Sequence, residues 1–106
     1  MLRVTIYQDL GEFVKVKIEG RLAGVRVSEM NRAWRELAPS IGSRKLSVDL
    51  RGVTFADAEG KRVLAEIHSR TGAEFLADTP LTKYYAEEAR QGIATNSVAD
   101  ELRRIS

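Results

Sequence analysis

Apolar and polar side chains alternate in two neighbouring stretches at the start of the chain, and this alternation limits the possible folds more than any other feature. Apolar residues take every second position within 2–7 and again within 14–18. A repeat of two predicts β-strands that bury one face. The short segment between the stretches contains Gly11, which predicts a turn that joins the strands as an antiparallel hairpin. The chain is therefore expected to begin with two paired strands.

After Gly20 the repeat of the apolar residues changes to that of a helix. Ser28 is a suitable N-cap residue, and Pro39 disfavours helical geometry at Ala38. The spacing of the apolar residues between them predicts an amphipathic helix that begins after Ser28 and ends at Pro39. These residues recur at i, i+3, i+4 and i+7, as Met30, Ala33, Trp34 and Leu37.

Strand and helix patterns alternate through the rest of the chain. Helices between consecutive strands imply right-handed crossovers and parallel pairing. The predicted fold class is therefore α/β, a single domain in which a mixed β-sheet starts with the hairpin, continues with parallel strands and is packed with helices. The predicted strands are 46–50 and 73–77, and the predicted helices start at the N-caps Asp57 and Thr79 and stop at Gly72 and Gly92.

The core of this domain is expected to cover about residues 2–92. A weaker helical pattern from Ser97 predicts a helical extension or tail over 93–106. In sheets of this kind, ligands and partners favour the loops at the carboxyl ends of parallel strands. The segment from Asp49 to Gly60 is predicted to be such a loop.

The composition excludes several classes of protein. The chain has 106 residues, which is room for one domain, and its net charge of +2 is too small to predict nucleic-acid binding. It has no cysteine and one histidine, which excludes disulfides and metal sites rich in cysteine or histidine. No apolar run exceeds three residues, whereas a membrane span needs about 20, and no signal peptide is visible. We expect a cytoplasmic protein without metal or cofactor.

Residues 49–60 carry the most specific motif of the chain. They read DLRGVTFADAEG and are followed by Leu64 and Gly72. This stretch resembles the STAS domain, the fold of bacterial anti-sigma factor antagonists and of the cytoplasmic tails of sulfate transporters, in which the pattern is Asp-Leu-x-x-Val-x-Phe-x-Asp-Ser-Ser-Gly. Residues 18–22 also resemble the Gly-x-Leu at a strand end of that family. The resemblance covers residues 2 to about 92.

The sequence departs from the family pattern at Ala58. In the antagonists, the serine at this position is phosphorylated by a partner anti-sigma kinase, and the phosphate switches binding off. Alanine has no hydroxyl group, so this position cannot be phosphorylated. Glu59 replaces the second serine and carries about one negative charge, against about −1.5 to −2 for a phosphate. Glu59 either imitates a phosphorylated state in part or only stabilises the helix N-terminus.

The resemblance implies a non-enzymatic protein-interaction module, similar to an anti-sigma factor antagonist, that regulates an anti-sigma factor or a kinase-like ATPase. The alternative is a STAS subunit of a membrane transport assembly of the ABC type. A small-ligand sensor is a third interpretation, for which the sequence contains no cofactor fingerprint. The partner, and whether the chain forms a homodimer, stay open. The expected contact residues are Thr54, Asp57, Ala58, Glu59 and Gly60.

An enzyme is the least favoured class, because no nucleophile, base and orienting residue occur at suitable spacing. His68 and its neighbour Ser69 diverge by about 100° around the predicted helix and cannot act as a base and nucleophile pair. Asp49 and Asp57 are a possible carboxylate pair for acid–base or Mg²⁺ chemistry, although Asp57 is also the expected helix cap.

Three hydroxyl-bearing residues are weaker candidates. Thr54 is a possible substitute site for phosphorylation if its side chain is accessible. Tyr84 and Tyr85 are adjacent on the last predicted core helix, so they cannot both be buried. The exposed tyrosine is a candidate contact for a partner, since tyrosine is favoured at interfaces.

Overall fold

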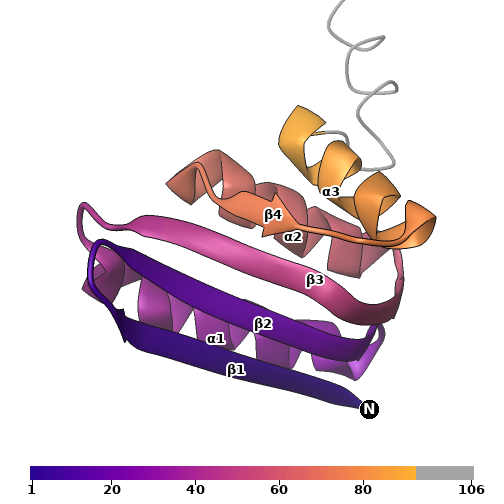
Figure 1. Cartoon of the computed structure of the whole chain (residues 1–106). Helices are drawn as coiled ribbons and strands as arrows, with labels where there is room; N and C mark the ends of the chain where they lie inside the picture. The colour runs from indigo at the N-terminus through magenta and orange to yellow at the C-terminus, as the bar shows by residue number, and fades with distance from the viewer. Residues whose placement is uncertain (93–106) are drawn as a thin grey trace, which may run out of the picture.

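The computed structural model describes residues 1–92 as a four-stranded sheet packed with three helices (Figure 1). The strands lie side by side in the order β1-β2-β3-β4. β1 pairs with β2 antiparallel, and the β2–β3 and β3–β4 pairs are parallel. This arrangement confirms the predicted mixed sheet. The elements are β1 (Leu2–Leu10), β2 (Phe13–Leu22), α1 (Val25–Ile41), β3 (Lys45–Ala56), α2 (Ala58–Thr71), β4 (Glu74–Leu76) and α3 (Pro80–Gln91).

One face of the sheet packs against the helices and forms the core. Figure 1 shows the strands in front of α1 and α2, with α3 beside α2. The alternation of the sequence sends every second side chain of β2 and β3 into this core, where Met30, Trp34, Leu64 and Ile67 meet them. Each fully buried apolar side chain stabilises the fold by about 1.5–3 kcal/mol. The residues that the two central strands bury are Val14, Val16, Ile18, Leu46, Val48 and Leu50.

The predicted limits of α1 were wrong at both ends. The helix begins at Val25, and its N-cap is Gly24 rather than Ser28. Val27 is buried, so the apolar stripe starts before Ser28 and the helix starts with it. At the other end the helix continues through Pro39 to Ile41. A proline in the last turn removes only one backbone hydrogen bond, and the continuation buries Ile41 in the core.

The predicted loop from Asp49 to Gly60 is mostly strand. β3 extends to Ala56, because the end of β2 offers it further pairing: Gly20 lies opposite Val53, and Leu22 lies opposite Ala56. The register shifts twice along this stretch, which the simple alternation of the sequence does not show. Only Asp57 separates β3 from α2.

The predicted starts and ends of α2 and α3 are confirmed. Asp57 is the N-cap of α2, and Gly72 ends that helix in the left-handed conformation. Thr79 caps α3, with Pro80 as its first residue, and Gly92 ends it. The fourth strand is shorter than predicted, since β4 contains only Glu74–Leu76.

The helical extension predicted for 93–106 lies outside the described residues. Within residues 1–92, no helix combines the length and the apolar character that crossing a membrane requires.

Candidate functional site

The turns that follow β2 and β3 are tied together by the carboxylate of Asp57. Its Oδ2 accepts a hydrogen bond from the Gly24 backbone N–H at 2.9 Å, and its Oδ1 accepts one from the Gly60 N–H at 2.8 Å. The Asp57 N–H in turn donates to the Leu22 carbonyl oxygen at 3.2 Å. One side chain therefore joins the turn before α1 to the first turn of α2, at the end of the sheet where β2 and β3 finish (Figure 1).

These hydrogen bonds also determine the charge of Asp57. Burial is the largest single influence and raises the pKa of this carboxyl, but hydrogen bonds from backbone N–H groups, first of all those of Gly24 and Gly60, together outweigh it, so the net shift is downward. Asp57 is ionised at neutral pH, and both of its oxygens already accept hydrogen bonds. Its role is that of a structural cap, and this leaves it unsuited to acid–base chemistry.

Gly60 allows the first turn of α2 to lie directly against the end of β2. It is buried, and a Cβ atom added there would overlap the Leu22 carbonyl oxygen and lie 3.0 Å from Leu22 Cγ. The contribution of Gly60 is thus the close approach of two backbones rather than a contact on the surface.

The exposed part of this region is formed by Thr54, Ala58 and Glu59, which we call the α2-start surface. The Glu59 side chain is 62% exposed, and its carboxylate pairs with Arg62 of the next turn at 3.2 Å. An exposed pair of this kind contributes little to stability. Thr54 and Ala58 are also exposed to solvent.

Large apolar side chains lie exposed beside the α2-start surface. Phe55 is 38% exposed and lies under the Arg21 guanidinium, whose central carbon is 4.6 Å from the ring centre. Val25, which follows Gly24, is 79% exposed. Tyr84 of α3 is 51% exposed, with Lys61 Nζ at 5.7 Å from its ring centre. These three side chains belong to segments that flank the α2-start surface, and exposed apolar groups are a common part of binding surfaces.

The two tyrosines diverge as predicted. Tyr85 is buried, and its hydroxyl oxygen accepts a hydrogen bond from the Ala56 N–H at 3.0 Å, which holds α3 against the end of β3. Tyr84 faces solvent, and the negative charge of the nearby Glu88 carboxylate raises the pKa of its phenol. Lys61 completes this group with an ion pair to Glu88 at 3.4 Å. The anchoring role of Tyr85 was not predictable, because only its helical position is visible in the sequence.

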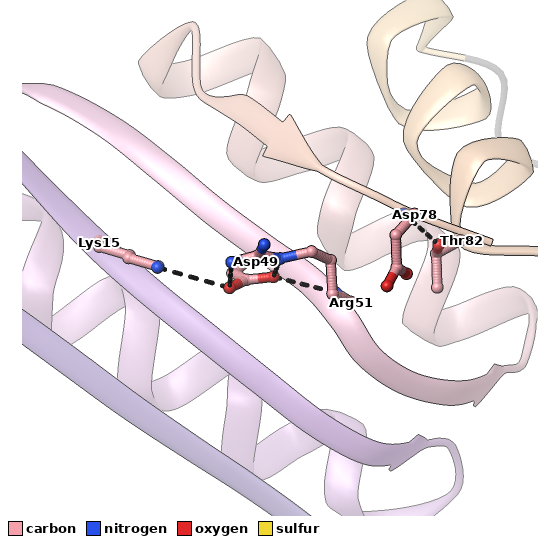
Figure 2. Close-up of polar contacts among 5 residues, drawn as sticks. All are labelled: Lys15, Asp49, Arg51, Asp78 and Thr82. Carbon is pink, nitrogen blue, oxygen red and sulfur yellow. Dashed lines mark hydrogen bonds and ion pairs between the residues drawn. The ribbon is translucent and has the colours of Figure 1, made fainter.

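Asp49 lies on the face of the sheet that the helices leave uncovered, and its carboxylate is almost completely covered by its neighbours (Figure 2). Arg51 donates to Oδ1 through Nε at 3.0 Å and to Oδ2 through Nη2 at 2.9 Å. Lys15 Nζ lies 3.5 Å from Oδ2. Asp78, whose N–H donates to Thr82 Oγ1 at 3.1 Å, adds a second negative charge near Arg51.

Asp49 and Asp57 do not form the carboxylate pair that the sequence permitted. The strand between them spans about 20 Å or more, and each carboxylate has its own set of donors. Among residues 1–92, no three acidic or histidine side chains gather as a metal site would require. His68 stacks on Phe75 with ring centres 6.0 Å apart, which is a packing contact.

Asp49 makes stability depend on pH in the acid range. The hydrogen bonds from Arg51 lower the pKa of Asp49 from 3.8 to about 2, and the charge of Lys15 acts in the same direction. Since the pKa is lower in the folded state, the stabilisation is complete above about pH 4 and is lost as the pH falls through about 2. We expect the wild-type protein to exceed Asp49→Asn by about 2 kcal/mol in free energy of unfolding at neutral pH.

Denaturant unfolding of both proteins between neutral pH and about pH 2 measures this contribution. The difference between them should stay constant from neutral pH down to about pH 4 and shrink below that pH. In Arg51→Met, which lacks the guanidinium, the loss should begin at a higher pH. A difference that stays constant over the whole range would show that Asp49 is not stabilised in its charged form.

No family model matches the chain, and no curated protein is similar to it in sequence. A solved structure of the anti-sigma factor antagonist SpoIIAA in its unphosphorylated form is similar to it in fold. The match covers 98% of this chain and 99% of SpoIIAA, with a TM-score of 0.64 and 15% sequence identity. At this identity the likeness concerns the fold alone. The chain therefore has the fold of an anti-sigma factor antagonist, which confirms the STAS-like domain predicted from residues 49–60.

Proposed function

We propose that the chain is a non-enzymatic protein-interaction module of the anti-sigma factor antagonist kind, acting in the cytoplasm on an anti-sigma factor or a kinase-like ATPase. The observation that carries the proposal is the start of α2, where Ala58 and Glu59 lie exposed on a turn that Asp57 holds with two backbone hydrogen bonds. A surface that is ordered before binding loses little conformational freedom on association. The residues proposed to form the partner site are Thr54, Asp57, Ala58, Glu59 and Gly60.

Within this set the residues divide into two roles. Thr54, Ala58 and Glu59 are exposed and would touch the partner. Asp57 and Gly60 would hold the surface in shape, the first by its hydrogen bonds and the second by its contact with the end of β2. The exposed Val25, Phe55 and Tyr84 would add the apolar contacts that protein interfaces use.

The module is proposed to lack a phosphorylation switch at the start of α2. Ala58 is the first residue of the helix and is exposed, but it offers a methyl group where phosphorylation requires a hydroxyl. Glu59, the next residue, supplies a single fixed negative charge. Control of binding would then come from the abundance of the module or from a competing partner.

Reversal of the charge at position 59 tests the contact. We expect Glu59→Lys to weaken partner binding at least about tenfold, or about 1.4 kcal/mol, because a positive charge would replace the negative one at the centre of the proposed surface. Isothermal titration calorimetry with the purified partner measures the affinity. Glu36→Lys is the matched control, since Glu36 is an exposed residue of α1 and the charge change is the same. If Glu59→Lys and Glu36→Lys bind the partner as tightly as the wild type does, the α2-start surface is not part of the interface.

The partner is identified by crosslinking in the native host, followed by mass spectrometry of the proteins captured on the tagged full chain. A histidine-kinase-like ATPase or an anti-sigma protein would support the antagonist role. An ABC-type ATPase or permease, recovered with the membrane fraction, would instead assign the chain to a transport assembly. In that case the affinity measurement with Glu59→Lys would be made on the ATPase.

A further inference from the structure

β1 is a long strand at one edge of the sheet. It contains nine residues, and in the part of the chain that the structure describes it pairs only with β2 (Figure 1). An edge strand presents backbone N–H and C=O groups on its free side, and these groups readily pair with another strand. Proteins protect such edges by shortness, by charges or by proline. The opposite edge is protected in this way, since β4 has only three residues.

β1 has little of this protection over most of its length, since Asp9 and an irregular register come only after Tyr7. The stretch 2–8 contains no proline, and Arg3 is its only charged residue. Ile6 belongs to the row that points toward the helices, opposite Val16, yet it is 38% exposed. A hollow of about 250 Å³ lies beside it, between β1 and α1, and is lined in part by Leu37 and Ser40. Tyr7 on the other face is 42% exposed.

The sequence of β1 is complementary to itself in one antiparallel register. If a second copy pairs with β1 about a twofold axis at Thr5, then Thr5 lies opposite Thr5 of that copy. Val4 then lies opposite Ile6, and Arg3 lies opposite Tyr7. Threonine pairs, pairs of β-branched residues, and a cation next to an aromatic ring are all favourable neighbours across strands. Every position from 3 to 7 is thus matched by its counterpart.

The two faces of the sheet are matched as well. Val4 and Ile6 lie opposite the buried Ile18 and Val16 of β2, whereas Thr5 lies opposite Lys17 on the uncovered face. In the register about Thr5, residues directly opposite share a face. The apolar row of one copy therefore meets the apolar row of the other, and the helices of both copies lie on the same side of one continuous sheet.

We propose that β1 is a self-association edge through which two copies of this chain join their sheets, with the twofold axis at Thr5. The pairing would satisfy the outward backbone groups of Val4 and Ile6 and would cover Ile6 with Val4 of the second copy. The Gln8 carbonyl oxygen, farther along β1, already accepts a hydrogen bond from Arg44 Nη1 at 3.1 Å. The Tyr7 ring already lies 6.0 Å from Lys15 Nζ of its own chain, and Arg3 of the second copy would approach it from the side away from β2. This edge is separate from the α2-start surface, so both can be occupied together.

Cysteine crosslinking of the full chain tests both the association and its register. The chain has no cysteine, so each variant carries a single thiol. Residues directly opposite in an antiparallel pair have Cα atoms about 4.5–5.5 Å apart, which a disulfide can bridge. Under mild oxidation we expect Thr5→Cys to form a covalent dimer at least about tenfold faster than Arg3→Cys. An equimolar mixture of Arg3→Cys and Tyr7→Cys should crosslink as a heterodimer at least about tenfold faster than either variant crosslinks alone.

Sedimentation of the wild-type chain provides a second measurement that needs no cysteine. We expect a concentration-dependent dimer, and we expect Ile6→Lys to raise its dissociation constant at least about tenfold, because two lysines would enter the apolar row. Circular dichroism confirms that the variant stays folded. A wild-type chain that remains monomeric up to about 1 mM overturns the proposal. Preferential crosslinking of Val4→Cys over Thr5→Cys overturns the register.

Discussion

Gly60→Ala is expected to lower the free energy of unfolding by about 3 kcal/mol, one of the two largest effects of any single substitution in the candidate site. The added methyl group would overlap the Leu22 carbonyl oxygen and crowd Leu22 Cγ. Both atoms lie at the end of β2, where backbone pairing with β3 prevents them from moving away freely. Urea or guanidinium unfolding of the variant and the wild type measures the loss.

Gly72→Ala separates this steric effect from the general cost of replacing a glycine. Gly72 has a φ of +68°, and no atom lies within 4 Å of the place that an alanine Cβ would take, so only conformational strain opposes alanine there. We expect that variant to lose about 1 kcal/mol. Gly60 carries no such positive φ, and alanine is otherwise the better helix former. A loss at Gly60 no larger than that at Gly72 would mean that α2 is not packed against the end of β2.

Asp57→Ala is expected to lower the free energy of unfolding by about 3 kcal/mol. The substitution removes the N-cap of α2, worth up to about 2 kcal/mol, and a second hydrogen bond worth about 1 kcal/mol. The second bond runs to the Gly24 N–H and joins α1 to α2. Besides the stability, hydrogen exchange of the Gly24 and Gly60 amides should become faster, since both N–H groups lose their acceptor.

Asp57→Asn is the matched control for this experiment. Its amide oxygen can still cap α2 through the Gly60 N–H, but its NH₂ group cannot accept from Gly24. We expect a loss of about 1 kcal/mol, with faster exchange at Gly24 and retained protection at Gly60. If the Gly24 amide exchanges at the same rate in the wild type and in both variants, and the Gly60 amide does so too, Asp57 does not connect the two turns.

Gly60→Ala and Asp57→Ala test one property of this region, and Glu59→Lys tests another. Gly60 and Asp57 determine whether the start of α2 is ordered, so their replacement lowers stability and weakens partner binding only as a consequence. Glu59 is exposed and makes one weak ion pair, so its replacement should alter binding at unchanged stability. The comparison distinguishes a contact residue from one that shapes the surface.

Local patterns in the sequence predicted the elements whose formation depends on nearby residues. The hairpin followed from alternation within two short stretches, and the caps at Asp57, Gly72 and Thr79 followed from residue types that satisfy helix ends within three or four positions. The motif in 49–60 predicted the STAS-like fold, which the likeness to SpoIIAA confirms. The contact residues assigned to the α2-start surface stay a prediction.

Features that depend on distant residues could not be predicted in this way. β3 extends to Ala56 because β2 pairs with it there, and α1 continues past Pro39 because Ile41 packs into the core. The covered position of Asp49 depends in part on Lys15 of another strand, in addition to its near neighbour Arg51, and that of Tyr85 depends on the Ala56 N–H. Apart from Arg51, none of these partners lies within the window that local periodicity samples.

The sequence by itself determined the order of strands and helices, the side of each element that enters the core, and the absence of a hydroxyl at Ala58, because these depend on residue type and on spacing along the chain. Only the tertiary structure decided that Asp57 joins two turns, that Gly60 lies against Leu22 and that Thr54, Ala58 and Glu59 are exposed. These relations arise when hydrogen-bond donors and apolar groups that are far apart in the chain are brought together by burial of the core.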